Sequence, residues 1–161
     1  MQWGYDRPVR SLELKLPPAA LVAICAALMY GVARGTPGLT FVYPARSVAG
    51  LVLGVFGLAV SFAGVLAFGK QGTTVNPTTP QAASVMVSQG VYRYTRNPMY
   101  LGFGVFLAGW AAYLSNVAAA LVLPLYVAYM TRFQIRPEER ALLAKFGGPF
   151  ADYMSEVRRW I

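Results

Sequence analysis

Histidine is missing from this sequence, and cysteine occurs once, at Cys25. Without histidine, the chain lacks the commonest protein ligand of transition metals and the side chain best suited to proton transfer near pH 7. A single cysteine excludes an internal disulfide and a cluster of thiolate ligands. The sequence therefore predicts that the protein has no metal site. It also predicts that any catalysis proceeds without a histidine base.

Charge is scarce as well. Only 12% of the 161 residues are charged, 57% are hydrophobic, and the mean hydropathy is +0.48. A soluble domain of this length needs a polar surface, so this composition predicts one domain, residues 1–161, whose outside faces lipid. The 14 Lys and Arg outnumber the six acidic residues. They flank apolar runs instead of forming a stripe, which favours membrane lipids over nucleic acid as partners.

The apolar runs predict the fold class, an all-α integral membrane protein with about four transmembrane helices, at about 19–33, 47–68, 99–114 and 117–133. The first run could be a signal peptide. A long preceding stretch that contains Asp6 and Glu13 favours a membrane helix, extended by the residues before Pro17. Only Ser115-Asn116 separates the last two runs, which predicts a tight antiparallel hairpin.

Small residues mark one face of the second run, at Gly50, Gly54, Gly57, Ser61 and Gly64. Such a face lets another helix approach closely, and packing within the bundle is favoured over a dimer seam. Pro124 predicts a kink in the last span.

The distribution of basic residues predicts the orientation. Twelve Lys and Arg lie in the N-terminal segment, the loop 70–98 and the tail that follows the last span, whereas the other side holds only Arg34 and Arg46. The positive-inside rule therefore places both termini and this loop in the cytoplasm. No span carries a charge at its centre, which disfavours a channel.

The tail 134–161 predicts two amphipathic helices. Pro137 is a good first helical residue, and Glu138 and Glu139 fall in the first turn, where the helix dipole favours anions. Gly147-Gly148 predicts a stop, after which apolar residues at helical spacing indicate a helix at the membrane surface.

Two motifs carry a family resemblance, "VMVSQGVYRYTRNPMYLG" and "RPEERALLAKFGGPFADYM". With the hairpin between them, they resemble the isoprenylcysteine carboxyl methyltransferases and the related membrane phospholipid methyltransferases, over about Thr73 to Trp160. The resemblance implies a membrane-embedded enzyme that uses S-adenosylmethionine. It also implies a cofactor pocket on the cytosolic side, formed by the loop before the hairpin and the start of the C-terminal helix.

Carried onto this sequence residue by residue, the resemblance implies cofactor contacts at Ser84, Val85, Met86, Val87, Tyr92, Asn97, Pro98, Met99, Tyr100 and Glu138. Gly102 matches the motif glycine, which implies close packing of the hairpin helix. Asn97 departs from the pattern, because the isoprenylcysteine enzymes usually have histidine there. This departure leaves cofactor binding in place and makes the substrate less certain.

The chemistry of S-adenosylmethionine agrees with several of these positions. Its cations need an anion or aromatic faces, and its carboxylate needs a donor. Glu138 or Glu139 could supply the anion, tyrosines the faces, and Arg96 the donor. The structural alternatives are a solvated first helical turn for the glutamates and membrane-surface anchoring for Arg93 and Arg96.

The sequence does not name the methyl acceptor. A carboxylate needs no base, so the lack of histidine favours the carboxylate of an isoprenylated cysteine or a similar prenyl compound. Arg136, at the end of the last span, is the residue expected to bind the acceptor's anionic group. The alternatives are N-methylation of phosphatidylethanolamine, methylation of a thiol, and a membrane scaffold without catalysis.

Overall fold

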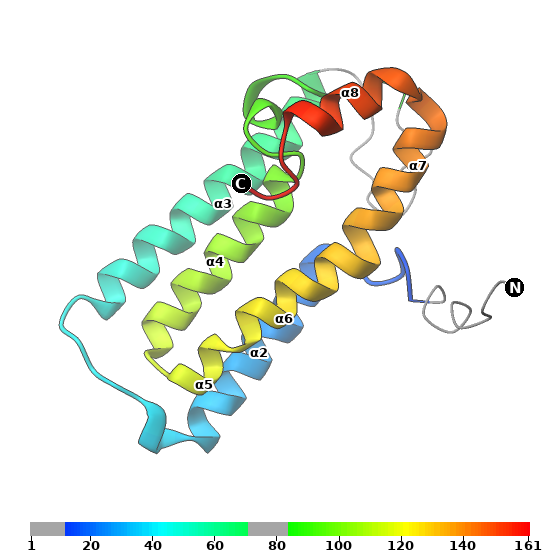
Figure 1. The fold of residues 1–161 in the computed structure, drawn as a ribbon. Coiled ribbons are helices and arrows are strands. Elements are labelled where there is room, and N and C mark those ends of the chain that lie inside the picture. The colour runs from blue at the N-terminus through cyan, green and yellow to red at the C-terminus, as the bar shows by residue number, and fades with distance from the viewer. Residues whose placement is uncertain (1–11, 71–83) are drawn as a thin grey trace, which may run out of the picture.

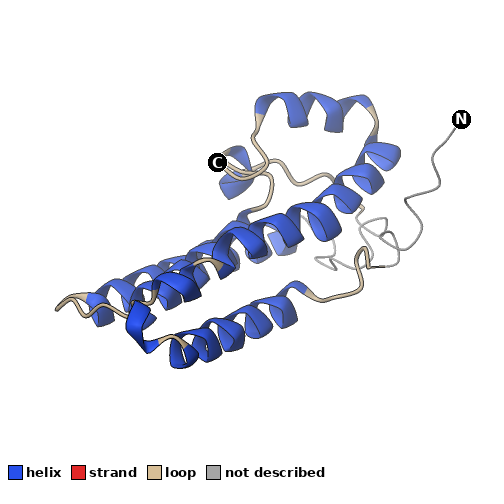
Figure 2. Cartoon of the chain, turned by 60° about the horizontal axis from the view of Figure 1, so that its bottom comes forward, coloured by secondary structure: helices blue, strands red, loops and turns tan. Residues whose placement is uncertain are grey.

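The computed structural model describes residues 12–70 and 84–161, which form a bundle of long helices (Figures 1 and 2). Within these ranges the structure has no β-strand, only an isolated bridge between Thr40 and Asn116. The predicted all-α fold is therefore confirmed. The elements are α2 (Pro18–Gly35), η1 (Pro37–Leu39), α3 (Arg46–Lys70), η3 (Gly90–Arg93), α4 (Pro98–Leu114), α5 (Val117–Ala120), α6 (Val122–Tyr129), a π-helical segment (Met130–Ile135), α7 (Arg136–Phe146) and α8 (Gly148–Glu156).

The first helix begins at Pro18, so its predicted extension before Pro17 is wrong. Pro18 suits the first helical position, where its missing N–H has no intrahelical partner anyway. Residues 12–16 form a turn instead, in which Leu14 has a positive φ of 58°. The part of the predicted cytoplasmic loop at 71–83 lies outside the described residues.

The last span and the tail are joined, contrary to the predicted boundary near residue 134. The chain is interrupted at Leu121, between α5 and α6, three residues before Pro124, whose missing N–H cannot bond to the carbonyl of Ala120. From Val122 the helix continues through the π-helical segment into α7. The stretch 117–146 is apolar and long enough overall to cross a membrane.

Pro137 lies at the junction between the π-helical segment and α7, and it changes the backbone hydrogen bonds there. Because proline has no N–H, the carbonyl of Phe133 lacks its usual helical partner. The backbone N–H of Leu14 donates to that carbonyl at 3.0 Å. The N–H of Arg136 reaches back five residues to the carbonyl of Thr131, as in a π-helix. The N-terminal segment thus completes a helix more than 100 residues away in the sequence.

The small-residue face of α3 packs against α4, as predicted for packing within the bundle. A Cβ added to Gly57 would lie 2.5 Å from the carbonyl oxygen of Gly102 and 2.5 Å from the backbone nitrogen of Phe106. A Cβ on Gly109 would lie 2.8 Å from the backbone of α3. Ser61 adds a hydrogen bond of 2.9 Å to the carbonyl of Met99. The two backbones therefore touch along one seam.

The core lies between α2, α4 and α6, where Met29, Leu107 and Tyr126 are almost completely buried. Outward-facing residues are apolar as well, and Leu51 and Leu125 remain 68% and 63% exposed. Among residues 12–70 and 84–161, three helices are long and apolar enough to cross a membrane, and α4 is a shorter apolar helix beside them. An apolar exterior on a packed core is typical of a multi-pass membrane protein.

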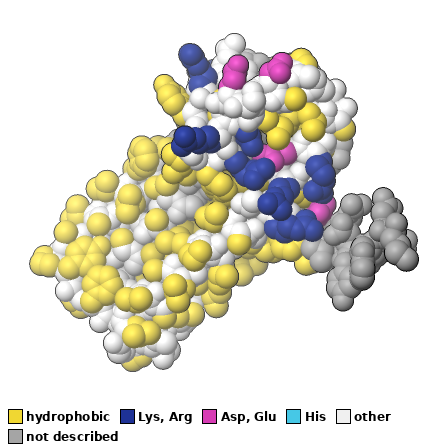
Figure 3. All heavy atoms as spheres, viewed as in Figure 1, with side chains coloured by type: hydrophobic (Ala, Val, Ile, Leu, Met, Phe, Trp, Pro, Cys, Tyr) yellow, Lys and Arg dark blue, Asp and Glu magenta, His cyan; other side chains and the backbone are white. Residues whose placement is uncertain are grey.

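Charged side chains gather at one end of the bundle, while the visible surface of the remainder is largely hydrophobic (Figure 3). This charged end, which we call the polar end, is where α4 begins and where α7 and α8 fold over the helices (Figure 1). The opposite end carries the turn between α4 and α5. There the side chain of Asn116 donates hydrogen bonds of 2.9 Å to the carbonyl of Thr36 and to Thr40 Oγ1.

Candidate functional site

The polar end brings together three segments that the sequence analysis singled out. These are the stretch 84–97, the first turn of α4 and the first turn of α7. Of the predicted site residues, Tyr100 and Glu138 meet directly in this arrangement.

Glu138 is the centre of this arrangement. The hydroxyl of Tyr100 donates to Glu138 Oε1 at 2.5 Å, and the side-chain nitrogen of Gln134 donates to the same oxygen at 2.5 Å. Gln134 precedes Glu138 by one helical turn, so the two lie on one face of the helix. Among the described residues, none donates to Oε2 of Glu138. The carboxylate is therefore oriented through one of its two oxygens.

Tyr92 provides an aromatic wall beside this carboxylate. It is buried in η3, its ring meets that of Phe68 edge to face at 5.4 Å, and its carbonyl accepts from the hydroxyl of Tyr153 at 2.7 Å. Burial is the main cause that raises the pKa of Tyr92 well above its usual value, with smaller contributions from Tyr153 and Glu138. Burial likewise raises the pKa of Tyr153 to about 12. Both hydroxyls stay protonated at neutral pH and so do not act as bases there.

Arg96 is held by protein groups. Its Nη2 donates to Glu139 Oε1 at 2.8 Å, and its Nη1 donates to the carbonyls of Met154 and Val157 at 2.7 and 2.5 Å. Its Nε is buried and has no hydrogen-bond partner among the described residues. Arg159 binds the second oxygen of Glu139 at 2.7 Å. The Arg96 and Glu139 side chains are only 9% and 10% exposed. The carboxylate of Glu139 and its hydrogen bonds to Arg159 raise the pKa of that arginine.

The neighbouring backbone is bound by the same C-terminal segment. The side-chain amide of Asn97 donates to the carbonyl of Arg159 at 2.8 Å, and the N–H of Arg96 donates to the carbonyl of Arg158 at 3.0 Å. Thr95 Oγ1 also donates to the carbonyl of Arg159, at 3.3 Å. In this arrangement Arg96 and Asn97 shape the site by holding the C-terminal segment. Their predicted contact with a cofactor stays a prediction.

The remaining predicted cofactor residues divide into two groups. Pro98 is buried, and Met99 packs against Gly64 of α3, so both belong to the α3–α4 seam. In the stretch 84–87, exposure falls along the chain: Ser84 and Val85 are exposed, Met86 is partly buried and Val87 is buried.

Met86 also lines an open groove of about 480 Å³ between this stretch and α8. The groove is closed on its other side by Pro149, Asp152, Tyr153, Glu156 and Val157, together with Ser88 and Arg93. Arg136, the predicted acceptor residue, is exposed at the start of α7. It forms no ion pair with a described residue.

Sequence reasoning missed three contributors. The sequence analysis gives no individual role to Gln134, Arg159 or Tyr153, all of which form hydrogen bonds here. A polar Gln134 four residues before Glu138 was the only available signal, since that spacing places both on one helix face. The partners of Arg159 and Tyr153 are distant in sequence, and no local pattern indicates them.

Replacing Glu139 tests the structural part of the site. We expect Glu139→Gln to lower the free energy of unfolding by about 3 kcal/mol, because it leaves the buried Arg96 guanidinium without its counter-ion. Thermal unfolding of the detergent-solubilised protein measures the change. Glu156→Gln removes an exposed carboxylate from α8 and serves as the matched control, expected within about 0.5 kcal/mol of the parent. Equal unfolding temperatures for both variants would contradict the assigned role.

Comparison with known proteins bears directly on this geometry. The family model for phospholipid methyltransferase matches residues 45–148, from the start of α3 to the start of α8. The chain belongs to the phospholipid methyltransferase family. The matched range contains all the predicted site residues. The predicted family and enzyme class, a membrane methyltransferase, are confirmed at this level.

The sequence is also similar to several proteins whose enzymatic activity is given in their names. Mouse protein-S-isoprenylcysteine O-methyltransferase is 29% identical over 111 residues, which are 69% of this chain and 39% of the mouse protein. The fission yeast protein of the same name is 30% identical over 73 residues, 45% of this chain and 31% of that protein. An uncharacterized protein of Haemophilus influenzae is 36% identical over 63 residues, 39% of this chain and 100% of that protein.

The matched stretch thus spans well under half the length of the named enzymes. No solved structure matches the chain. These comparisons establish the family and leave the donor and the acceptor to be proposed.

Proposed function

We propose that the chain transfers a methyl group from S-adenosylmethionine to a lipophilic acceptor at its polar end. One observation carries this proposal. The carboxylate of Glu138 is oriented by Tyr100 and Gln134 beside the buried ring of Tyr92, where the apolar helices meet the charged end. On the charge distribution, this end faces the cytoplasm.

The residues at the site fit most of the donor's groups. Oε2 of Glu138 suits the ammonium or the sulfonium, and the rings of Tyr92 and Tyr100 suit a cation. Val87 and Met86 offer apolar surface for adenine. The donor's carboxylate is the exception, since both terminal guanidinium nitrogens of Arg96 are engaged with Glu139 and backbone carbonyls, and its Nε is buried. S-Adenosylmethionine would supply an activated methyl group.

The task left to the chain is positioning. Tyr100 and Gln134 fix the carboxylate of Glu138, and the paired Arg96 and Glu139 fix the backbone of the stretch leading into α4. Fixed geometry converts an encounter of two reactants into a step within one complex. The segment 154–159 and α8 cover the site and limit water there.

For the acceptor, we favour the carboxylate of an isoprenylated cysteine or a similar prenyl compound. Such a carboxylate is already ionised at neutral pH, which suits a site without histidine and with protonated tyrosines. Arg136 is exposed at the start of α7, where it can pair with this anion. The alternatives are phosphatidylethanolamine N-methylation, thiol methylation and a scaffold without catalysis.

An acceptor panel with labelled methyl donor separates these alternatives. We expect transfer to acetyl-farnesylcysteine to exceed transfer to phosphatidylethanolamine or a small thiol. Arg136→Ala should raise the KM for the carboxylate acceptor about tenfold or more, because a hydrogen-bonded charge pair is lost. Arg158→Ala removes an exposed basic residue of the same end and is the matched control.

Unchanged KM in Arg136→Ala would show that this arginine does not bind the acceptor. Transfer to the amine or the thiol alone would replace the favoured acceptor. No transfer to any acceptor, together with no binding of S-adenosylhomocysteine in several detergents, would favour the scaffold.

A further inference from the structure

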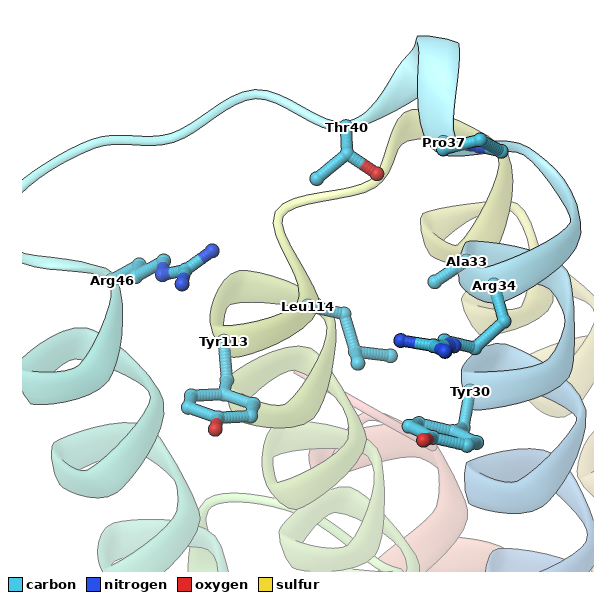
Figure 4. Close-up of a pocket in the computed structure, with 8 residues that line it drawn as sticks. All are labelled: Tyr30, Ala33, Arg34, Pro37, Thr40, Arg46, Tyr113 and Leu114. Carbon is cyan, nitrogen blue, oxygen red and sulfur yellow. The ribbon is translucent and has the colours of Figure 1, made fainter.

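A second pocket lies at the end of the bundle opposite the candidate site. Its volume is about 670 Å³ (Figure 4). It is formed where α2 ends, where α3 begins and where α4 ends, and the lining residues are Tyr30, Ala33, Arg34, Pro37, Thr40, Arg46, Tyr113 and Leu114. None of these residues belongs to the proposed methyl-transfer site.

Two cations converge on this pocket. Arg34 comes from the last turn of α2 and Arg46 from the first turn of α3, and both guanidinium groups point into the space between the helices (Figure 4). The sequence contains no Asp or Glu between Glu13 and Glu138. Both of those carboxylates are placed at the polar end, Glu13 by its ion pairs with Arg132 and Arg140. The two arginines therefore face each other without an acidic partner among the described residues.

The walls around these arginines are fixed by hydrogen bonds. Thr40, which lines the pocket, accepts from the side-chain amide of Asn116 at 2.9 Å. The N–H of Phe41 donates to the carbonyl of Ser115 at 2.9 Å, and the hydroxyl of Tyr43 donates to the carbonyl of Ala112 at 3.2 Å. The loop between α2 and α3 is thus tied to the end of α4, so the pocket does not need to form on binding.

We propose that this pocket binds the phosphate group of an anionic membrane lipid. Two guanidinium groups present forked donors that match phosphate oxygens, and the start of α3 adds the positive end of a helix dipole. A soluble phosphate has the same chemistry. A lipid is favoured because exposed apolar side chains adjoin the pocket, including Leu39, Phe41 and Val48, which are 51%, 54% and 64% exposed. Acyl chains can lie along them.

The position of the pocket gives this binding a structural consequence. Arg34 lies on α2 and Arg46 on α3, and both of these helices pack against α4. A headgroup held by both arginines links α2 to α3 from outside. The lipid then acts as a bridge between helices at the end remote from the chemistry.

Native mass spectrometry with added lipid tests the proposal. We expect the full chain to retain phosphatidylglycerol in preference to phosphatidylcholine, and Arg34→Gln/Arg46→Gln to weaken phosphatidylglycerol binding at least about tenfold. Lys15→Gln/Arg158→Gln removes two exposed charges at the polar end and is the matched control, expected to bind as the parent does. Arg34→Lys/Arg46→Lys keeps both positive charges but loses the forked donors. Its affinity for phosphatidylglycerol should lie between that of the parent and that of the Gln variant.

A competition arm with inorganic phosphate distinguishes the two sources. If inorganic phosphate displaces phosphatidylglycerol from the parent only at high concentration, the result supports a lipid as the occupant of the pocket. Strong phosphate binding without lipid retention would place a soluble phosphate in the pocket and overturn the lipid assignment. Equal phosphatidylglycerol binding by the Gln variant and the matched control would overturn the site itself. A thermal shift that phosphatidylglycerol gives the parent and the Lys variant, but not the Gln variant, is a second supporting readout.

Discussion

Glu138→Gln should weaken binding of the methyl donor by about 10- to 100-fold. Glutamine keeps the size of the side chain and an oxygen that can accept from Tyr100, so the main loss is the negative charge. A hydrogen bond to a charged group is worth about 1.5–3 kcal/mol, which corresponds to that range of affinity. Calorimetry on the detergent-solubilised protein, with S-adenosylmethionine as ligand, measures the change.

The same experiment identifies which cation Glu138 binds. S-Adenosylhomocysteine keeps the ammonium and lacks the sulfonium. If Glu138 binds the ammonium, both ligands weaken equally in Glu138→Gln; if it binds the sulfonium, only the methionine form weakens. Lys15→Gln, which removes an exposed charge before α2 and outside the groove lined by Met86, is the control. If Glu138→Gln bound both ligands with unchanged affinity, the carboxylate of Glu138 would not be part of the donor-binding site.

Gly57→Ala should disrupt the bundle. The added Cβ would lie 2.5 Å from both the carbonyl oxygen of Gly102 and the backbone nitrogen of Phe106. Both atoms belong to the backbone of α4, so neither can swing aside, and the two helices must separate along the seam. Overpacking of this kind costs about 1–3 kcal/mol or more. We expect a large loss of monodisperse protein in size-exclusion chromatography and a lower unfolding temperature in detergent.

A second glycine provides the control for this prediction. Gly31 lies inside α2, and a Cβ added there would meet no atom within 4 Å. Gly31→Ala should therefore leave the fold intact and stabilise it by about 0.5–1 kcal/mol through helix propensity. If Gly57→Ala behaved like Gly31→Ala, the close α3–α4 seam would be wrong.

The sequence predicts the membrane helices well because their signal is local. Four apolar runs, a two-residue turn and a face of small residues each belong to one short stretch, and the structure bears out all three. The small residues also gave the correct choice between a bundle seam and a dimer seam. The predicted helix start at Pro137 agrees with α7, which begins at Arg136. Its continuity with the last span did not follow from the sequence, since the group that satisfies the carbonyl of Phe133 comes from Leu14.

In the candidate site, too, the features carried by local motifs were predicted, and those that depend on partners distant in the sequence were not. Glu138 and Tyr100 follow from the two motifs, and the structure brings them together at 2.5 Å. The fixed position of Arg96 did not follow, because the sequence favours a functional or site-shaping role for this arginine without deciding between a ligand contact and a bond within the protein. Its partner Glu139 lies 43 residues away, and only folding decides which of two adjacent glutamates faces the arginine.

The π-helical turn before α7 determines the direction in which Glu138 points. Such a turn accommodates one more residue than an α-helical turn, and each residue of an α-helix advances the side chains by about 100°. If the segment Met130–Ile135 were wound as ordinary α-helix, every side chain beyond it would be rotated by more than a quarter of a circle. Glu138 would then face away from Tyr100, although no atom of either residue had changed. The carbonyl of Phe133, within this turn, accepts from the N–H of Leu14, so the N-terminal segment contacts the turn on which the proposed site depends.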